Sequence, residues 1–555
     1  MRAEKWVGLS LLLIAGFSYA LRGLFFSAPR QVERPLDTLF IGTTMPQTRF
    51  SIASQDGAFG RMNYNAFVQA KLVDLDENND VMPDMATSWE ISEDNRSLTF
   101  TLADGIRWHD GTLLTREDME FTFALLRKNP SSSVSRFVER VEYLDDQRFR
   151  LWFKAPMAFG FLQNNANSFF FYPKHIWENV EIPSQYRGAD AAVGCGPYRL
   201  VEIDAIANRS LYEAVPDHFR GSVRVSRVVV QSYTSQEALL AALRSGQIDA
   251  VYDYSRPIRP TLVPFIAGRS HVELGGSRNT GNHMLVFGFH RYPTNDLSFR
   301  QAVAYALRYE LWIRAISGKD GEVATRGVIS PDNTGFDPSL DKLRYDPGRA
   351  AEILTGAGFV DRDGDGWRDL PDGSPMDVGI TLLDSKRNDD QSLRLAEILQ
   401  TDLRRVGIRT HVDIDTLRNN AVWEERVLQK QDYELFIGYN TSGVARFETA
   451  AFYFMPKEAG YPWGTWHDPQ FIEVYRQMIH SVDKAAYATH VKALQQVLAE
   501  GLPAISLGWD SVYYPYRTDR FAGWVYYPAW GVINPKTWHN IRAYPARDGQ
   551  ANPPA

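Results

Sequence analysis

The sequence predicts an α/β protein with more than one domain. Its 555 residues exceed the length at which one hydrophobic core stops growing, so two or more domains are expected. From Asp37 onward, strand-like segments and turns alternate, and several segments further along have helical spacing. The composition, with 44% hydrophobic and 23% charged residues, is that of an ordinary globular protein.

Charge and cysteine content narrow the classes of function. The formal net charge of −7 argues against a nucleic-acid partner, which would require a basic surface. The single cysteine, Cys195, excludes an intrachain disulfide and a zinc site built from several cysteines. Aromatic residues make up 13% of the chain; most are expected in the core, and the surplus also fits a wide ligand cleft.

The N-terminus has the layout of a secretory signal peptide. Basic residues precede an apolar run from Trp6 to about Ala20, and Ser18 and Ala20 supply small residues at the −3 and −1 positions of a cleavage site. The run is about 15 residues long, short of the roughly 20 that a membrane span needs. Residues 1–35 are therefore assigned to an export leader and linker, with an uncleaved anchor as the alternative.

Three elements stand out in the first half of the chain. Residues Asp37–Thr44 have the pattern of an opening strand. A helix is predicted over Leu114–Leu126, where a capping-box-like start precedes apolar residues at helical spacing. Residues Ala238–Asp249 predict a helix that ends at Gly246 and leads into a strand.

The second half predicts one strand and two helices. Met284–Phe289 is a nearly continuous apolar run, which indicates a buried strand. Apolar residues every four positions predict one amphipathic helix over Phe299–Leu311. Tyr345–Phe359 predicts a helix with proline at its first position and glycines at its end.

The most distinctive stretch is VGCGPYRL, residues 193–200. Gly194 and Gly196 flank Cys195 and permit a sharp turn, and Pro197 then fixes the backbone before a strand-like pattern resumes. Cys195 has no basic or histidine neighbour in sequence that would lower the pKa of its thiol. We therefore interpret it as a small residue that fills a tight turn, with a reactive thiol as the alternative.

Several segments resemble the peptide/nickel-type family of solute-binding proteins of ABC importers. VGCGPY resembles the family's VGTGPY turn, with Cys195 where threonine is usual. Residues 105–123, GIRWHDGTLLTREDMEFTF, resemble the family's FHDGTPLTAEDVVFT motif. Residues 345–359, YDPGRAAEILTGAGF, resemble its YDPEKAKELLAEAGF helix, and residues 432–439, DYELFIGY, resemble the strand that leads to its ligand loop. The matching segments follow in the family's order across about residues 37–530.

The resemblance implies a two-lobed periplasmic-binding-protein (Venus-flytrap) fold in which each lobe is a mixed sheet flanked by helices. Lobe I would comprise residues 36–280 and 510–545, with an extra subdomain at about 81–190, and lobe II residues 281–509. The tail, residues 546–555, is polar and rich in glycine and proline, and we expect it to be disordered.

The resemblance also implies a function in transport. The chain would be the substrate-binding component of an ABC transporter in the periplasm, would capture a peptide-like solute between its lobes, and would deliver it to an ABC permease in the inner membrane. We expect a monomer without a cofactor. No P-loop, HExxH or GxSxG motif occurs, so we expect no enzymatic activity. A membrane-tethered sensor is the less favoured alternative.

The identity of the solute depends on residues 440–454. In peptide binders of the resembled family, this loop carries an acidic cluster that pairs with the peptide's α-ammonium. Here it has Arg446 in that place and Glu448 as the nearest acid. A buried ammonium without a partner is costly, and an arginine suits a carboxylate or phosphate. A non-peptide solute, such as an oligosaccharide, an anionic small molecule or a metal chelate, is therefore the alternative.

Ligand contacts are expected from both lobes, because family members line the cleft from both sides. Some candidates are aromatic residues suited to stacking on a ligand, for which core packing is an equally good interpretation; the others are polar or lie in the first turn of lobe I. The candidates are Thr44, Met45, Tyr64, Tyr439, Asn440, Arg446, Glu448, Trp463 and Trp466.

An acidic run that begins at Asp361 partly matches a calcium-binding loop. Carboxylates occupy positions 1, 3, 5, 9 and 12, and glycine occupies position 6, where such a loop turns sharply. Position 12 is aspartate, whose shorter side chain reaches bidentate geometry less easily than glutamate, and no clear helix follows. A solvated turn is therefore favoured over a calcium site. The residues concerned are Asp361, Asp363, Asp365, Asp369 and Asp372.

Overall fold

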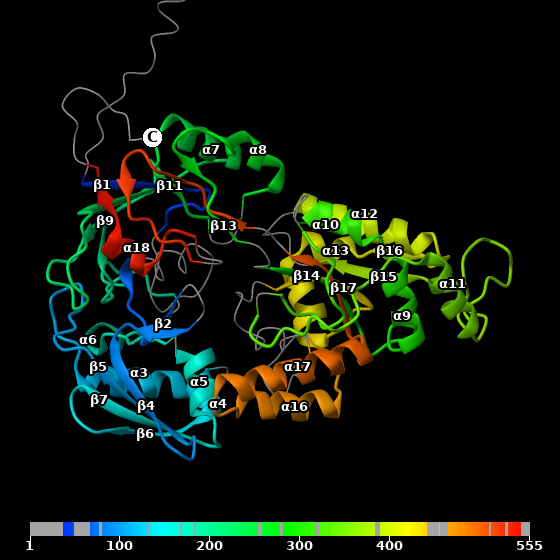
Figure 1. Ribbon diagram of the computed structural model, residues 1–555, viewed down its shortest axis with the longest axis horizontal. Helices are drawn as coiled ribbons and strands as arrows, with labels where there is room; N and C mark the ends of the chain where they lie inside the picture. Colours follow the sequence, from blue (N-terminus) through cyan, green and yellow to red (C-terminus); the bar gives the residue numbers. More distant parts are fainter. Residues whose placement is uncertain are drawn as a thin grey trace, which may run out of the picture.

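The computed structural model contains two bodies of sheet and helix, lobe I on the left and lobe II on the right of Figure 1. It describes residues 37–48, 67–76, 80–129, 132–166, 169–182, 185–253, 258–277, 281–316, 321–331, 333–382, 389–440, 454–455, 464–509, 512–527 and 531–544. The predicted leader, linker and tail lie outside these residues.

Lobe I is built on a seven-stranded sheet with the order β12-β20-β11-β1-β10-β9-β8. β1 lies between β10 and β11 and is parallel to both, whereas β9 and β8 continue the sheet as antiparallel strands. β20 comes from the C-terminal part of the chain, so the sheet is discontinuous in sequence. The strands are β1 (Thr38–Thr43), β8 (Tyr198–Asp204), β9 (Arg209–Ala214), β10 (Arg227–Ser232), β11 (Ala250–Val251), β12 (Val272–Glu273) and β20 (Tyr516–Arg517).

A four-stranded antiparallel sheet with the order β4-β5-β7-β6 forms the subdomain of lobe I. Its buried residues belong to the same hydrophobic cluster as those of the seven-stranded sheet, so the two pack as one body. Its elements are β4 (Ala86–Ile91), β5 (Ser97–Leu102), β6 (Val138–Tyr143), β7 (Arg148–Phe153), α3 (Arg116–Arg127), α4 (Ser133–Phe137), α5 (Ala158–Asn164) and α6 (Lys174–Trp177).

Smaller elements complete lobe I. Helix α7 packs against β1 and β11, which lie in the middle of the large sheet. The C-terminal elements return to the core of the lobe, where Trp538 of α18 is fully buried. The elements are β2 (Val73–Leu75), β3 (Val81–Pro83), α7 (Gln236–Ser245), a 3-10 turn η4 (Pro260–Leu262), α8 (Val263–Ile266), β21 (Phe521–Ala522), α18 (Pro535–Asn540) and β22 (Arg542–Ala543).

Lobe II is built on a five-stranded mixed sheet with the order β16-β15-β17-β14-β18. β15 is parallel to β16 and β17, and β14 is antiparallel to both of its neighbours. The strands are β14 (Asn282–Phe287), β15 (Val378–Leu382), β16 (Thr410–Val412), β17 (Leu435–Asn440) and β18 (Ala504–Trp509).

Helices cover both faces of this sheet. Leu285 and Phe287 of β14 pack with helices α9 to α12, whereas Met284 and Val286 pack with α16 and α17 on the opposite face. The helices are α9 (Leu297–Ala306), α10 (Tyr309–Ile316), α11 (Pro347–Gly356), α12 (Asp389–Arg404), α13 (Ile414–Arg418), α14 (Asn420–Trp423), the π-helical segment η5 (Glu424–Lys430), α16 (Pro469–Ile479) and α17 (Lys484–Gly501).

The two lobes are connected by neighbouring strands. On the side of lobe I, β13 (Gly276–Ser277) pairs with β19 (Val512–Tyr513). On the side of lobe II, β14 pairs with β18. The chain therefore passes from β13 to β14 and returns from β18 to β19 at one place in the molecule, near the centre of Figure 1.

Most helices predicted from the sequence are confirmed, together with their ends. Thr115 and Asp118 form the capping box of α3. Helix α7 ends at Gly246, whose φ of 74° is the left-handed conformation that glycine tolerates. In α11, the side chain of Asp346 accepts a hydrogen bond from the amide of Arg349, and proline follows at the first helical position. The buried strand predicted over 284–289 is β14, which is buried on both faces.

The prediction of one helix over 299–311 is wrong, because α9 ends and α10 begins within it. Leu307 has an extended backbone between the two helices. The buried carboxylate of Asp402 accepts hydrogen bonds from the amide of Arg308 at 3.1 Å and from the indole of Trp312 at 3.0 Å, and it forms an ion pair with the Arg308 guanidinium. This partner on α12 interrupts the helix and fixes the start of α10.

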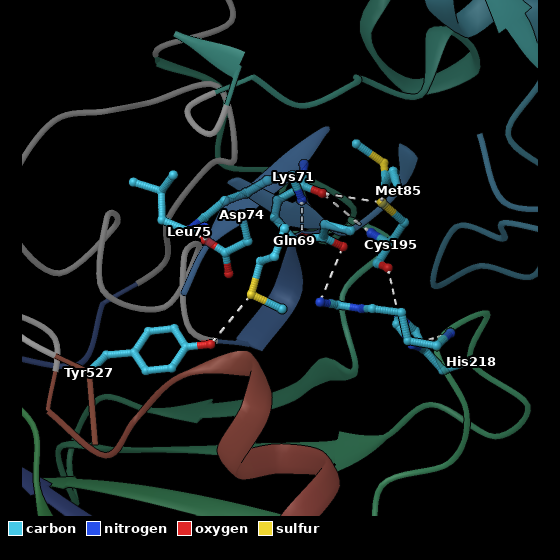
Figure 2. Close-up of polar contacts among 11 residues, drawn as sticks. Gln69, Lys71, Asp74, Leu75, Met85, Cys195, His218 and Tyr527 are labelled. Atoms are coloured by element: carbon cyan, nitrogen blue, oxygen red, sulfur yellow. Dashed lines mark hydrogen bonds and ion pairs between the residues drawn. The ribbon is translucent and has the colours of Figure 1, made fainter. Parts of the chain in front are cut away.

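The VGCGPYRL segment is the predicted tight turn, and it leads into β8. Gly194 and Gly196 are required by close approach of backbone: a β-carbon at Gly194 would overlap the carbonyl oxygen of Val68, and one at Gly196 would lie 2.6 Å from the amide nitrogen of Gln69. Cys195 is fully buried. Figure 2 shows its thiol between Gln69 and Met85, at 3.6 Å from Gln69 Oε1 and 3.8 Å from Met85 Sδ.

The groups around this turn are neutral or paired. Burial raises the pKa of the Cys195 thiol to about 12, so the thiol is not a nucleophile at neutral pH. The carbonyl of Cys195 accepts a hydrogen bond from His218 at 3.1 Å (Figure 2). Burial raises the pKa of the Asp84 carboxyl, while the neighbouring Arg220 guanidinium, at 3.1 Å, favours its charged form. The groups around Cys195 therefore stabilise the backbone of the turn, and Cys195 has a structural role there.

Candidate ligand-binding site

The candidate site begins where the parallel strands of lobe I end. Because β1 is parallel to β10 and β11, the residues after Thr43, Ser232 and Val251 lie at one edge of the sheet. In open α/β sheets, ligands bind outside the carboxyl ends of the strands. This edge includes Thr44 and Met45, two of the predicted ligand contacts.

Thr44 and Asp253 connect the turn after β1 to the turn after β11. The backbone amide of Thr44 donates a hydrogen bond to Asp253 Oδ2 at 3.0 Å, and the Thr44 hydroxyl donates to the same oxygen. Asp253 is buried, whereas Thr44 is half-buried. A carboxylate that accepts two such bonds fixes the end of β1 at the edge of the sheet.

Met45 and Gln47 stabilise the same turn from the side of the hydrophobic core. Met45 packs in the core of lobe I, and its carbonyl accepts a hydrogen bond from the Gln47 side chain at 3.0 Å. Gln47 also accepts a hydrogen bond from the Ser210 hydroxyl at 2.6 Å. The structure therefore places the Met45 side chain in the core beneath the edge, and Thr44 is the predicted contact that is partly exposed there.

The facing edge of lobe II is formed where β17 and β18 end and β14 begins. Asn440 pairs with Asn282, and Tyr439 pairs with His283, so the backbones of both predicted residues lie at this edge. The side chain of Asn282 accepts a hydrogen bond from the Ser506 hydroxyl at 2.6 Å. Trp509, the last residue of β18, is the other partner of Asn282. This edge adjoins the two connections to lobe I.

The remaining predicted contacts are placed differently. Tyr64, Arg446, Glu448 and Trp463 lie outside the described residues. Trp466 is only 7% exposed and packs against Phe454 and Phe471 in the core of lobe II. A β-carbon at Gly501 would lie 2.6 Å from its indole ring, so the ring fills space beside α17. Among the two interpretations of Trp466, these contacts favour core packing.

The acidic turn brings three of its five predicted calcium ligands together. Carboxylate oxygens of Asp361, Asp363 and Asp365 lie within 4.8 Å of one another, and all three residues are exposed. The two oxygens of Asp361 accept hydrogen bonds from the amides of Gly364 and Gly366, at 2.7 and 2.9 Å. Such bonds hold a solvated turn without an ion.

The other two predicted calcium ligands serve neighbouring turns. Asp369 accepts a hydrogen bond from the amide of Arg362 at 3.0 Å, and Asp372 accepts one from the amide of Ser374 at 2.9 Å. Asp365 also forms an ion pair with Arg409 at 2.7 Å. Each of these carboxylates therefore has a structural partner, and calcium binding stays the less favoured alternative from the sequence.

Asp253 and the Asn282–Ser506 pair were not found from the sequence. Asp253 follows the short strand after the SGQID segment, and Asn282 precedes the apolar run of β14. A polar residue at the end of a predicted strand is the pattern that points to such positions. It becomes informative only when the pairing of β1 with β11, and of β14 with β18, is known.

Comparison with known proteins identifies the family. The model of bacterial extracellular solute-binding proteins, family 5 (middle), matches residues 80–461, which is more than half of the chain. The chain belongs to this family. The predicted relationship to peptide/nickel-type binding proteins of ABC importers is thereby confirmed, and so is the substrate-binding role.

Individual family members are similar over nearly the whole chain. The dipeptide-binding protein of Escherichia coli is 22% identical over 484 residues, which cover 82% of this chain and 85% of that protein. The crystal structure of the oligopeptide-binding protein AppA from Bacillus subtilis, in complex with a nonapeptide, has a TM-score of 0.74 and 19% identity over 92% of this chain and 99% of its own.

A third similar protein has a different kind of ligand. NikZ from Campylobacter jejuni, in complex with Ni(L-His), has a TM-score of 0.73 and 21% identity, over 92% of this chain and 100% of its own. These structures confirm the predicted two-lobed fold. The family is one of extracellular solute-binding proteins. Among the described helices, none combines the length and apolar character needed to cross a membrane.

Proposed function

We propose that this family 5 protein captures a peptide-like solute between lobes I and II and delivers it to an ABC permease in the membrane. The observation that carries the proposal is a pair of sheet edges that lie on either side of the two connections between the lobes. Thr44 and Asp253 lie at the edge of lobe I, and Asn282 and Asn440 lie at the edge of lobe II. A solute that touches both edges favours the closed arrangement by its difference in affinity for the two states.

Peptide is the first candidate for the solute. The E. coli relative is named a dipeptide-binding protein, and AppA was crystallised with a nonapeptide. An extended peptide would be held largely by hydrogen bonds to its main chain, which depend little on its side chains.

A metal chelate or another anionic solute is the second candidate. Arg446 replaces the acid expected in the loop after β17, so a buried α-ammonium has no carboxylate at that position of the sequence. NikZ, in complex with Ni(L-His), has a similar fold. An arginine suits the carboxylate groups of such a chelate.

The solute is identified by what the protein retains. The mature chain is purified without denaturation and analysed by native mass spectrometry, and candidate classes are then tested by thermal shift. A peptide-like ligand is expected, with a rise of about 3 kcal/mol in stability at a concentration 100-fold above Kd. A retained nickel chelate supports the second candidate. If peptide, oligosaccharide and chelate panels all leave the melting temperature unchanged, the binding function is contradicted.

Export and oligomeric state complete the proposal. The leader over residues 1–35 would direct the chain to the periplasm, where we propose that it acts as a monomer and not as an enzyme. N-terminal sequencing of the periplasmic protein tests this directly. A start shortly after Ala20 supports cleavage, whereas an intact Met1 in the membrane fraction supports the tethered alternative.

A further inference from the structure

The lobes touch at a second place, away from the connecting strands. Figure 1 shows α5 of the subdomain beside α16 and α17 of lobe II, below the level of β13. The contact involves the C-terminal end of α16, where Ile479 is the last helical residue, and the turn that follows it. The last carbonyls of a helix lack partners within the helix and accept hydrogen bonds from elsewhere.

Asn95 joins two helix ends from different lobes. Its backbone carbonyl accepts hydrogen bonds from the amides of Met157 and Ala158, at 2.8 and 2.9 Å, and its side-chain Oδ1 accepts one from Phe159 at 2.9 Å. These bonds hold the start of α5. Its side-chain Nδ2 donates to the carbonyl of Ser481 at 3.3 Å, across the contact. An amide can accept on one side and donate on the other, which a carboxylate cannot do.

Gly160 brings the backbones of the two lobes together. A β-carbon at this buried residue would overlap the carbonyl oxygen of Ile479. Its neighbour Phe159 packs against the hydrophobic cluster formed by α16 and α17. At the rim, Lys484 at the start of α17 forms an ion pair with Asp80 of lobe I at 2.6 Å, with both side chains exposed.

We propose that this contact, formed by Asn95, Gly160 and Asp80 with Ile479, Ser481 and Lys484, is a latch that holds the lobes in the closed arrangement. A rotation of one lobe relative to the other displaces contacts that lie off its axis, so opening is expected to separate α5 from the end of α16. Among the described residues, the latch includes the Asn95–Ser481 hydrogen bond, the close backbone contact at Gly160, the packing of Phe159 and one exposed ion pair. Contacts of these kinds can separate and re-form.

The inference rests on the proposed function, in which the lobes close on a solute, because the latch would control that closing motion. Each lobe keeps its own sheet and core when the latch separates, since the connecting strands pair elsewhere. The latch therefore sets the balance between open and closed forms, and through it the apparent affinity for any solute that binds the closed form.

The experiment measures the distance between the lobes with no solute present. Spin labels are attached to Ala241→Cys in α7 and Glu310→Cys in α10, both exposed, while the buried Cys195 stays unlabelled. The chain is refolded from denaturant to remove bound solute, and Asn95→Asp is compared with the unsubstituted chain. Aspartate keeps the acceptor for Phe159 but loses the donor to Ser481. The ratio of separated to docked molecules is expected to rise about fivefold, as for one lost hydrogen bond.

Lys484→Ala provides a second variant that does not touch the packed core, and its effect is expected to be in the same direction but about twofold or less. Lys174→Ala is the matched control, since it removes an exposed ion pair with Glu117 inside the subdomain. Equal distance distributions in all four chains overturn the latch. A loss of folding in Asn95→Asp with no effect of Lys484→Ala also overturns it. Neither result bears on solute binding, which the retained-ligand experiment tests separately.

Discussion

Two tight backbone contacts in this protein have the same local chemistry and different neighbours. In lobe I, Gly194 lies against the carbonyl of Val68; between the lobes, Gly160 lies against the carbonyl of Ile479. At both places the absence of a side chain allows one backbone to approach another closely. Because the partner is a carbonyl group in each case, no change of side chain on the partner can relieve a substitution.

The difference is in what surrounds each contact. The amide of Gly196 donates to the carbonyl of Val68 at 2.9 Å, and His109 and His218 bind the same turn from outside, so the Gly194 contact cannot open without breaking the core of lobe I. The Gly160 contact joins two bodies that each have a core of their own. The same added methyl group should therefore unfold the protein at one place and separate the lobes at the other.

The largest effect is expected for Gly194→Ala. The methyl group would overlap the carbonyl of Val68, whose position is fixed by the bond from Gly196, so strain of about 3 kcal/mol or more is expected. Thermal and urea unfolding measure the loss. Gly356→Ala is the control, because a β-carbon there meets open space. An unchanged melting temperature for Gly194→Ala would mean that the turn is loosely packed.

Acid should weaken the same turn. His109 Nδ1 accepts a hydrogen bond from the backbone amide of Gly194 at 3.3 Å, and His218 Nδ1 accepts one from the backbone amide of Arg220 at 3.3 Å. A ring nitrogen that accepts carries no proton, so both rings must be neutral. Burial lowers the pKa of His109 to about 4 and, with the Arg220 charge, that of His218 to about 3. The unfolded chain binds protons near pH 6.5, so stability is full above that pH and falls as the pH drops toward these values.

Each histidine is expected to contribute a slope of about 1.4 kcal/mol per pH unit within that window. Urea unfolding at pH 7, 6 and 5 measures the slope. His218→Gln is the informative variant, because its side-chain amide can donate to Cys195 and accept from Arg220 without titrating. The slope should become shallower in this variant. A slope that is the same in both chains would assign the acid sensitivity to other groups.

Gly160→Ala should act on the lobes and not on the fold. The position is helical, where alanine is favoured over glycine by up to about 1 kcal/mol, so the subdomain should keep or gain stability. The methyl group nevertheless meets the carbonyl of Ile479 and should shift the distance between labels on α7 and α10 to longer values. A drop in melting temperature with no change in that distance would place Gly160 in the same class as Gly194.

This contrast also separates what the sequence could predict from what it could not. The ends of α7 and α11 were predicted because their capping residues are local in sequence. The break between α9 and α10 was missed because its cause, Asp402, lies 94 residues from Arg308. The VGCGPY turn was predicted, but the reason for its glycines, the nearby backbone of residues 67–69, depends on the tertiary structure.

The same limit applies to the site. The resemblance placed Thr44 and Asn440 at strand ends, and the sheets bring those ends to two edges. Asp253 lies 209 residues from Thr44, and the contact of Asn95 with Ser481 spans 386 residues. Neither Asn95 nor Gly160 belongs to a motif recognised in the sequence. Their role in the contact between the lobes emerges only when α5 and α16 are seen side by side (Figure 1).

The smallest effect is expected for Cys195→Thr, which restores the residue usual in the resembled family. The threonine hydroxyl can donate to Gln69 as the thiol does, while the added methyl group must fit beside Met85. These changes nearly balance, so a difference of about 1 kcal/mol or less in unfolding free energy is expected. The distance between the lobes should not change, because the turn lies within lobe I. A large loss of stability would show that the space around Cys195 admits a thiol and nothing bulkier, whereas a change in lobe distance would couple this turn to the latch.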